Sequence, residues 1–91
     1  MNIDEEIMLI AQEECAEVTQ AISKVFRFGM DGMHNGRSNR DRLEEEIGDL
    51  QCMINLMADR GLIDPVAILE AKQRKLKKLE QWSNIRDNTM D

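Results

Sequence analysis

The sequence has few of the residues that stabilise β-rich or disulfide-linked domains. Its 91 residues include one proline, two cysteines and 3% aromatic residues, and β-branched residues form few runs. Two cysteines are too few for a disulfide scaffold and indicate reduced thiols in a cytoplasmic protein. No apolar run approaches the length that spans a membrane, and the N-terminus is acidic where a signal peptide would be basic. We therefore expect a soluble, cytoplasmic, all-α protein.

Several functional signatures are missing as well. The chain has no Gly-x-x-x-x-Gly-Lys phosphate loop and no Rossmann fingerprint, so ATP-driven work and dinucleotide chemistry are not indicated. The net charge of −6 argues against a general binder of nucleic acid or of anionic membranes. The composition, 42% hydrophobic and 33% charged, is typical of a globular protein. At this length we expect a single small domain, residues 1–91, whose core supplies little net stability unless a metal or oligomerisation helps.

Glycines and capping residues divide the chain into three predicted helices. The helix starts are marked by capping pairs, namely Asn2 with Glu5, Ser38 with Asp41, and Asp64 before Pro65. Gly29 and Gly61 follow the first two helices as stops. We expect helices at about 2–28, 38–60 and 64–82, a loop at about 29–38 and a tail at about 83–91. Gly48 lies inside the second helix, where we expect something to approach the backbone closely.

Acidic residues fall within the apolar arcs of the first two helices. At about 100° per residue, Glu14 projects inside the apolar arc of the first helix, and Glu17 lies at its edge. In the second helix, Glu46 and Asp49 point from within the apolar face. Each helix therefore directs an i, i+3 carboxylate pair at the same core. Unpaired carboxylates in such a place would be costly, so we expect a cation to meet them.

The ligand set favours a hard divalent cation. Carboxylate oxygens suit Mg²⁺ or Mn²⁺, whereas the one histidine, His34, lies in the predicted loop and leaves a poor set for zinc or a di-iron centre. The alternative is that the four acids lie at helix edges, solvated or paired with Arg and Lys. Their recurrence inside a second apolar arc favours the metal site.

Basic residues supply candidates for binding phosphate. Lys72 and Lys75 fall within the apolar arc of the third helix, which predicts that they face the bundle and can meet an anion. Alternatively, Lys72 snorkels and its neighbours form a solvated basic face. Arg37, Arg40 and Arg42 precede the second acidic pair and either close over phosphates or form a plain polar surface.

Several further residues are candidates for chemical roles. Glu13 projects next to Glu17 and could act as the general base, with Glu45 a weaker candidate, although both could be surface glutamates. Trp82 could stack on a nucleobase, although a lone Trp at the end of an apolar stripe more often packs in a core or interface. A nucleophilic pair of Cys15 with His34 is formally possible but lacks an orienting arrangement.

The acidic motifs resemble a known superfamily. Glu-Glu-x-x-Glu at 13–17 and, 28 residues further on, Glu45-Glu46-Ile47-Gly48-Asp49-Leu50 closely resemble the all-α nucleoside triphosphate pyrophosphohydrolases, which include MazG, the helical dUTPases and phosphoribosyl-ATP pyrophosphohydrolase. Residues 13–29 look especially like small single-domain MazG-like proteins, many of them carried by phages. The resemblance implies Mg²⁺ at Glu14, Glu17, Glu46 and Asp49, basic residues of the third helix near the substrate phosphates, and a homodimer or homotetramer with sites near the subunit contact.

These observations predict a small antiparallel bundle of three main helices that is completed by oligomerisation, because its apolar arcs are wider than one partner helix would cover. The expected function is Mg²⁺-dependent hydrolysis of a (d)NTP to the monophosphate and pyrophosphate, for nucleotide-pool housecleaning or regulation. One alternative is an enzyme like phosphoribosyl-ATP pyrophosphohydrolase. Another is a non-catalytic helical module that binds nucleotide or metal. The chain ends soon after Trp82, whereas longer members of the superfamily have more helix there. The sequence therefore does not identify the residues that would form a base pocket.

Overall fold

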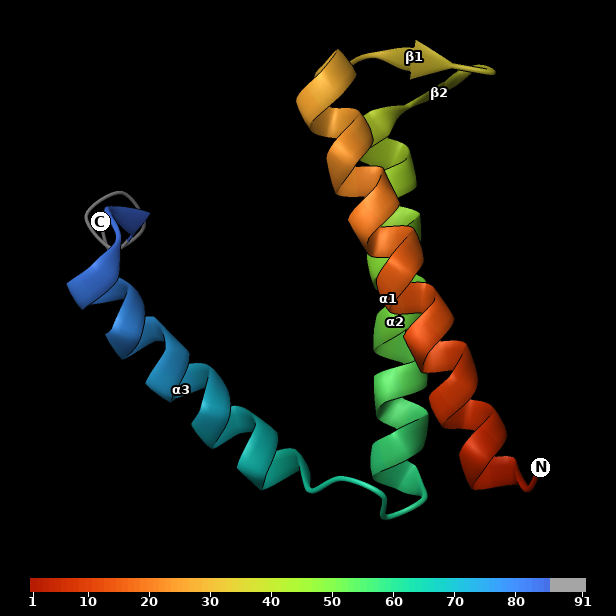
Figure 1. The fold of residues 1–91 in the computed structure, drawn as a ribbon, viewed down its shortest axis with the longest axis vertical. Coiled ribbons are helices and arrows are strands. Elements are labelled where there is room, and N and C mark those ends of the chain that lie inside the picture. The colour runs from red at the N-terminus through yellow and green to blue at the C-terminus, as the bar shows by residue number, and fades with distance from the viewer. Residues whose placement is uncertain (86–91) are drawn as a thin grey trace.

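The computed structural model describes residues 1–85. Its elements are, in chain order, α1 (Ile3–Phe28), β1 (Met33–His34), β2 (Arg37–Ser38), α2 (Asn39–Asp59) and α3 (Pro65–Trp82). Helices α1 and α2 lie side by side and antiparallel, whereas α3 extends away from them to form an open V (Figure 1). The predicted all-α class with three main helices is confirmed. Most of the predicted tail, 83–91, lies outside the described residues.

The helix boundaries follow the capping chemistry that the sequence predicts. The side chains of Asn2 and Ser38 each accept a hydrogen bond from the third backbone N–H of their helix, and the acid at that position bonds back to the cap, so both capping boxes form. Asp64 accepts from the backbone N–H of Val66 and precedes a proline at the first helical position. Within residues 1–85, no helix is long and apolar enough to cross a membrane.

The connection between α1 and α2 is more ordered than the predicted loop. Met33 pairs with Ser38 and His34 with Arg37 in a short antiparallel hairpin. Its turn residues, Asn35 and Gly36, both have positive φ, 53° and 78°, as a type I′ turn requires. The Asn-Gly pair is a hairpin signal in the sequence, but the strands beside it are too short to show an alternating pattern.

Asn39 attaches this connection to the start of α2. Its side-chain amide donates to the carbonyl oxygen of Gly29 at 2.9 Å, and its backbone N–H donates to the carbonyl oxygen of Gly32 at the same distance. Asn39 is 4% exposed and is the buried polar residue of the described chain. Because each of these bonds satisfies a group that would otherwise be buried alone, Asn39 holds the hairpin in one position over the helix ends.

The core between α1 and α2 is thin. Its buried apolar residues are Ile7, Ala11 and Ala21, and the two alanines allow the helices to approach closely. At the open ends of the helices, Arg60 Nε lies 2.7 Å from a carboxylate oxygen of Asp4, an exposed ion pair that contributes at most about 1 kcal/mol. The radius of gyration is 16.0 Å, against about 12 Å for a compact domain of this length. One chain therefore does not close the bundle.

The glycines give a direct test of the hairpin attachment. A Cβ added at Gly32 would lie 2.5 Å from the carbonyl oxygen of Phe28 and 3.0 Å from the side-chain nitrogen of Asn39. Gly32→Ala should therefore shift the backbone and lower the Tm, by an amount corresponding to about 1–3 kcal/mol. Gly48→Ala is the control, because a Cβ there meets nothing within 4 Å and the helix should gain up to about 1 kcal/mol. Equal Tm values for the two variants would contradict this account.

Candidate metal centre

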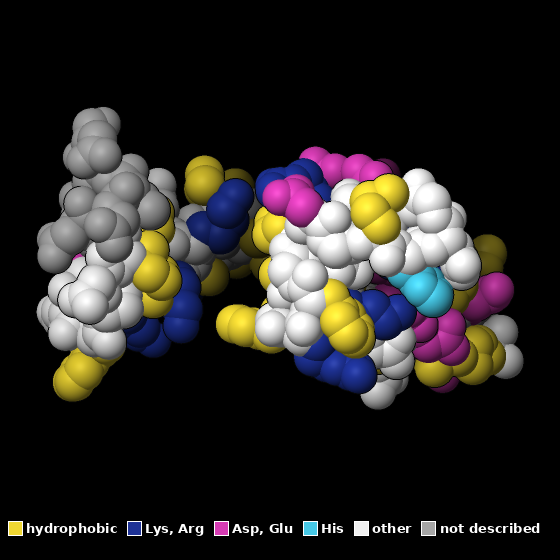
Figure 2. Space-filling view, turned by 90° about the horizontal axis from the view of Figure 1, so that it is seen from above, with side chains coloured by type: hydrophobic (Ala, Val, Ile, Leu, Met, Phe, Trp, Pro, Cys, Tyr) yellow, Lys and Arg dark blue, Asp and Glu magenta, His cyan; other side chains and the backbone are white. Residues whose placement is uncertain are grey.

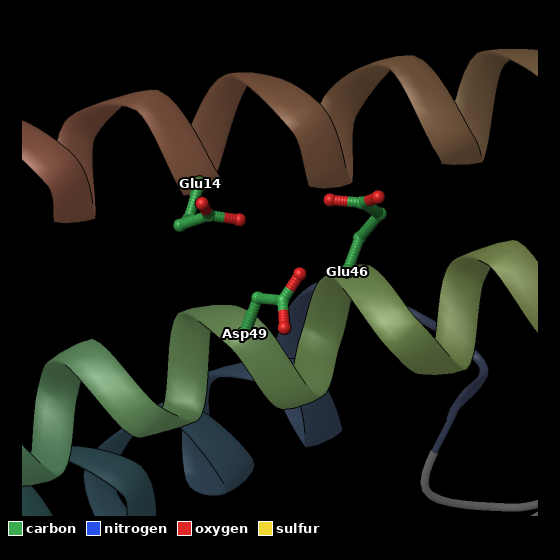
Figure 3. A group of neighbouring side chains, drawn as sticks. All are labelled: Glu14, Glu46 and Asp49. Carbon is green, nitrogen blue, oxygen red and sulfur yellow. The ribbon is translucent and has the colours of Figure 1, made fainter.

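Three carboxylates from two helices meet in the space between α1 and α2. Glu14 comes from α1, and Glu46 and Asp49 come from successive turns of α2 (Figure 3). One ligand oxygen of each lies within 4.8 Å of the others. Each of the three points from its helix toward the other helix, which is the orientation that the helical periodicity predicts. We expected another group to approach the backbone at Gly48 closely. Within the described residues none does, because a Cβ added there would meet no atom within 4 Å.

The three acids repel one another in a partly desolvated position. Glu14 and Glu46 are half-buried, whereas Asp49 is exposed. Burial and then the charge of Asp49 raise the pKa of Glu14 above its ordinary value. Burial and then the charges of Glu17 and Asp49 raise the pKa of Glu46. No Lys or Arg within residues 1–85 forms an ion pair with any of the three, so the negative charge of the group is not compensated by the chain itself.

Glu17, the fourth predicted ligand, lies beside this group but is not part of it. Its side chain is exposed, as its position at the edge of the apolar arc allows. It is close enough for its charge to raise the pKa of both Glu14 and Glu46. Glu13 is also exposed and acts on Glu14 in the same way, more weakly. Both acids therefore add negative charge beside the three carboxylates.

The predicted phosphate-binding residues are not at the acids of their own chain. Lys72 and Lys75 are exposed, because α3 does not pack along α1 or α2. In the single chain they face solvent, and their expected contact with the bundle and with phosphate stays a prediction. Trp82, at the end of α3, is 82% exposed. Arg40 is exposed and forms an ion pair of 3.4 Å with Asp31 at the hairpin end.

Two other cations lie nearer the acids. Lys24 and Arg42 line a small cavity together with Glu17 and Glu46. The same two cations line an adjoining cavity of about 250 Å³ that continues to the hairpin, with walls that include Phe28, Met33, His34 and Asn39. Figure 2 shows the histidine, Lys and Arg side chains and apolar side chains gathered at this end of the helix pair. The cations therefore lie between the acids and a partly apolar pocket.

The sequence gives only a weak signal for these two cations. Arg42 follows Arg37 and Arg40 closely in the chain, yet Arg37 is paired with Glu45, whereas the Nε of Arg42 is buried without a hydrogen-bond partner within the described residues. Lys24 belongs to none of the sequence motifs described above. The signal was their spacing, because Arg42 precedes Glu46 by four residues and Lys24 follows Glu17 by seven, which places each cation on the same helix face as an acid. The pairing of Glu45 with Arg37 also weakens its case as a general base.

The donor set suits a hard cation. Within the part of the chain that the structure describes, the group able to hold an ion consists of carboxylates alone. His34 belongs to the hairpin cavity and adds no nitrogen ligand to this group. Oxygen donors of this kind fit Mg²⁺ or Mn²⁺, and a divalent charge would offset the repulsion that raises the pKa of Glu14 and Glu46.

Comparison with known proteins connects this geometry to a family. The family model of the MazG nucleotide pyrophosphohydrolase domain matches residues 3–84 of the chain, which include all three carboxylates. No curated protein and no solved structure matches the chain.

A divalent cation should stabilise the folded protein through these acids. Mg²⁺ at one hundred times its Kd should raise the free energy of unfolding by about 2.7 kcal/mol, read as a rise in Tm. Glu46→Gln should lose most of this rise because it removes a charged ligand, whereas Glu44→Gln, an exposed glutamate outside the group, should keep it. The same rise in Glu46→Gln as in the intact protein would exclude this site.

The repulsion also predicts how stability depends on pH without metal. A raised pKa means that folded Glu46 binds its proton more tightly than the unfolded chain does, so its contribution to stability is complete below the ordinary value of 4.5 and is lost as the pH rises through the raised pKa. Glu46→Gln, neutral throughout, should therefore have a higher Tm than the intact protein at pH 7, and the difference should shrink toward pH 4.5. A difference that grows on acidification would be opposite in sign.

Proposed function

Because the chain belongs to the MazG nucleotide pyrophosphohydrolase domain family, we propose that it hydrolyses nucleoside triphosphates to the monophosphate and pyrophosphate. The observation that carries the proposal is the meeting of Glu14, Glu46 and Asp49 between two helices with no cation of their own chain to neutralise them. Transfer of a phosphoryl-type group depends mainly on positioning and on charge neutralisation, which such a site can supply.

The acids have two roles in this reaction. Glu14, Glu46 and Asp49, with Glu17 beside them, would hold Mg²⁺ or Mn²⁺, which when bound neutralises phosphate oxygens and orients the attacking water. Glu13 is the proposed general base: its carboxylate is exposed, its charge reaches Glu14, and it would accept the proton of the attacking water. The oxygen of that water forms the new bond to phosphorus as the phosphoanhydride bond breaks and pyrophosphate leaves.

Cations would hold the polyphosphate. Lys24 and Arg42 lie beside Glu17 and Glu46, and the buried Nε of Arg42 is a donor that no group within residues 1–85 uses. Charge-assisted hydrogen bonds from such donors to phosphate oxygens are strong. Lys72 and Lys75 remain proposed phosphate ligands from α3, whereas Arg40 is a weaker one because it is paired with Asp31.

The exposed apolar side chains and the free cysteines suggest which partners and which compartment the protein has. Because one chain leaves large apolar side chains exposed on all three helices, we expect a homodimer or homotetramer. Cys15 and Cys52 are exposed and unpaired, which fits the reducing cytoplasm, where nucleotide pools are housecleaned or regulated. Trp82 is exposed and is available to stack on a base or to pack against another chain.

Pyrophosphate release from a panel of ribo- and deoxyribonucleoside triphosphates, with and without Mg²⁺, tests the proposal. The intact protein should release pyrophosphate with Mg²⁺, and Glu46→Ala and Glu17→Ala should each reduce the rate, Glu46→Ala by about a hundredfold or more because a metal contributes several kcal/mol. Glu44→Ala, an exposed glutamate of the same helix, is the matched control and should keep the rate.

The other outcomes identify the alternatives. If the intact protein binds a nucleotide or Mg²⁺ but releases no pyrophosphate from any triphosphate, it is a binding module. Release from phosphoribosyl-ATP alone would instead identify an enzyme of that more specialised kind.

A further inference from the structure

The hairpin covers a cavity at one end of the helix pair that the acids and the polyphosphate do not fill. Its volume is about 250 Å³, somewhat below the roughly 300–1,000 Å³ of pockets that enclose a drug-sized ligand. Side chains of three elements line it, namely Lys24 and Phe28 of α1, Met33 and His34 of β1, and Asn39 and Arg42 of α2. The cavity therefore has room for one ring system rather than for a whole nucleotide.

The hairpin wall of this cavity is fixed to both helices. The side-chain amide of Asn39 donates to the carbonyl oxygen of Gly29 at 2.9 Å, and its backbone N–H donates to that of Gly32 at the same distance. Gly32 also lies so close to the end of α1 that an added Cβ would be 2.5 Å from the carbonyl oxygen of Phe28. The cavity is thus formed by the fold itself, as most ligand pockets are.

The apolar walls suit a flat, unsaturated ring. The guanidinium of Arg27 lies over the ring of Phe28, 4.9 Å from its centroid, which leaves the other face of that ring for a ligand. Phe28 and Met33 are 60% and 67% exposed, so a ligand between them would remove apolar surface from water. Aromatic rings and thioether sulfurs both form favourable contacts with the face of a heterocycle. A nucleobase has such faces and a polar edge.

The charged groups of the cavity are hydrogen-bond donors. Lys24 and Arg42 have N–H donors and no acceptor, and the buried Nε of Arg42 has no partner within the described residues. No aspartate or glutamate is among the residues described as lining this cavity. A base edge that meets these cations must therefore offer acceptors. Guanine offers O6 and N7, and thymine and uracil offer O4, whereas adenine and cytosine present an amino group at the corresponding position.

The cavity also lies where the base of a bound triphosphate would reach. Lys24 and Arg42 line both this cavity and the smaller one beside Glu17 and Glu46. Because a helix rises about 1.5 Å per residue, Arg42 lies about 6 Å and Asn39 about 10 Å from Glu46 along the axis of α2. The sugar and the first phosphate fit in that interval. The five donors of an arginine allow Arg42 to serve a phosphate and a base together.

We propose that the cavity between the hairpin and the adjoining ends of α1 and α2 holds the base of the substrate. Phe28 and Met33 lie against the faces of the base, and Lys24 and Arg42 meet its edge, so the substrates are triphosphates of the keto bases guanine, thymine and uracil. The inference rests on the proposed function for the position of the phosphates. The shape and donors of the cavity identify the base.

Steady-state kinetics test the assignment. The kcat/KM for dGTP and dTTP should exceed that for dATP and dCTP about tenfold or more. Phe28→Leu should raise the KM for dGTP about tenfold with little change in kcat, because stacking on the base is the same in the ground state and the transition state. Phe26→Leu is the matched control, because this phenylalanine of α1 is 87% exposed and is not part of the cavity wall.

Three kinetic results would overturn the proposal. The first is a preference for dATP and dCTP, and the second is an equal KM for dGTP in the two phenylalanine variants. The third is a base preference that changes in Trp82→Ala but not in Phe28→Leu, which would place the base at α3. A Phe28→Leu variant that associates differently but keeps its KM would show that a second copy, not a base, covers the cavity.

Binding of dGMP tests the cavity without turnover, because dGMP has no phosphoanhydride bond. In protein labelled with ¹³C at its methionine methyl groups, Met33→Leu identifies the NMR signal of Met33. Stacking of the base should shift this signal, whereas Met8, on α1 outside the cavity wall, should not respond. Pyrophosphate should leave Met33 unmoved, and dCMP should need about tenfold more ligand than dGMP for the same shift.

The same experiment separates this inference from the proposed function. A Met33 signal that dGMP leaves unmoved up to its solubility limit, or that pyrophosphate shifts equally, would overturn the base pocket. Pyrophosphate release together with an unmoved Met33 signal would leave the proposed function intact. A shift with dGMP in a protein that releases no pyrophosphate from any triphosphate would support the pocket and refute the proposed function alone.

Discussion

The repulsion between carboxylates held together by two closely packed helices is the constraint on which the site depends. The small side chains of Ala11 and Ala21 let α1 and α2 approach, and that approach brings Glu14 to Glu46 and Asp49. Partial burial makes their charge more costly, as the raised pKa of Glu14 and Glu46 indicates. The helix pair alone therefore carries an unfavourable interaction that a divalent cation would convert into a favourable one.

The chain also separates positive from negative charge. Negative charge is concentrated on α1 and α2, and positive charge is concentrated on α3, which stands apart from them. Here the thin core, with three buried apolar residues, and the open V leave both apolar area and charge unmatched. The proposed metal, polyphosphate and second copy would each stabilise the folded chain by binding to these unmatched groups.

Much of this structure could be predicted from sequence because it is local. The helix boundaries depend on Asn2, Ser38 and Asp64 as caps, whose hydrogen bonds involve residues two or three positions away. The inward direction of Glu14, Glu46 and Asp49 follows from helical periodicity alone. The exposure of Glu17 follows from the same periodicity, which places this residue at the edge of the apolar arc of α1.

The rest depends on long-range arrangement. A helical wheel shows that Lys72 and Lys75 belong to an apolar stripe, but it does not say which surface covers that stripe, so their exposure in the single chain was not predicted. The hairpin at Asn35 and Gly36 has strands too short for an alternating pattern. The spacing places Lys24 on the face of Glu17 and Arg42 on the face of Glu46, but only the packing of α1 against α2 brings all four residues to one cavity.

The location of a divalent ion tests the central claim most directly. Crystals grown with Mn²⁺ and measured at a wavelength where manganese scatters anomalously would show the position of the ion independently of activity. The account predicts an anomalous peak between the carboxylates of Glu14, Glu46 and Asp49, and its disappearance in Glu46→Gln. A well-ordered structure of the intact protein at saturating Mn²⁺ without a peak at these three residues would contradict it.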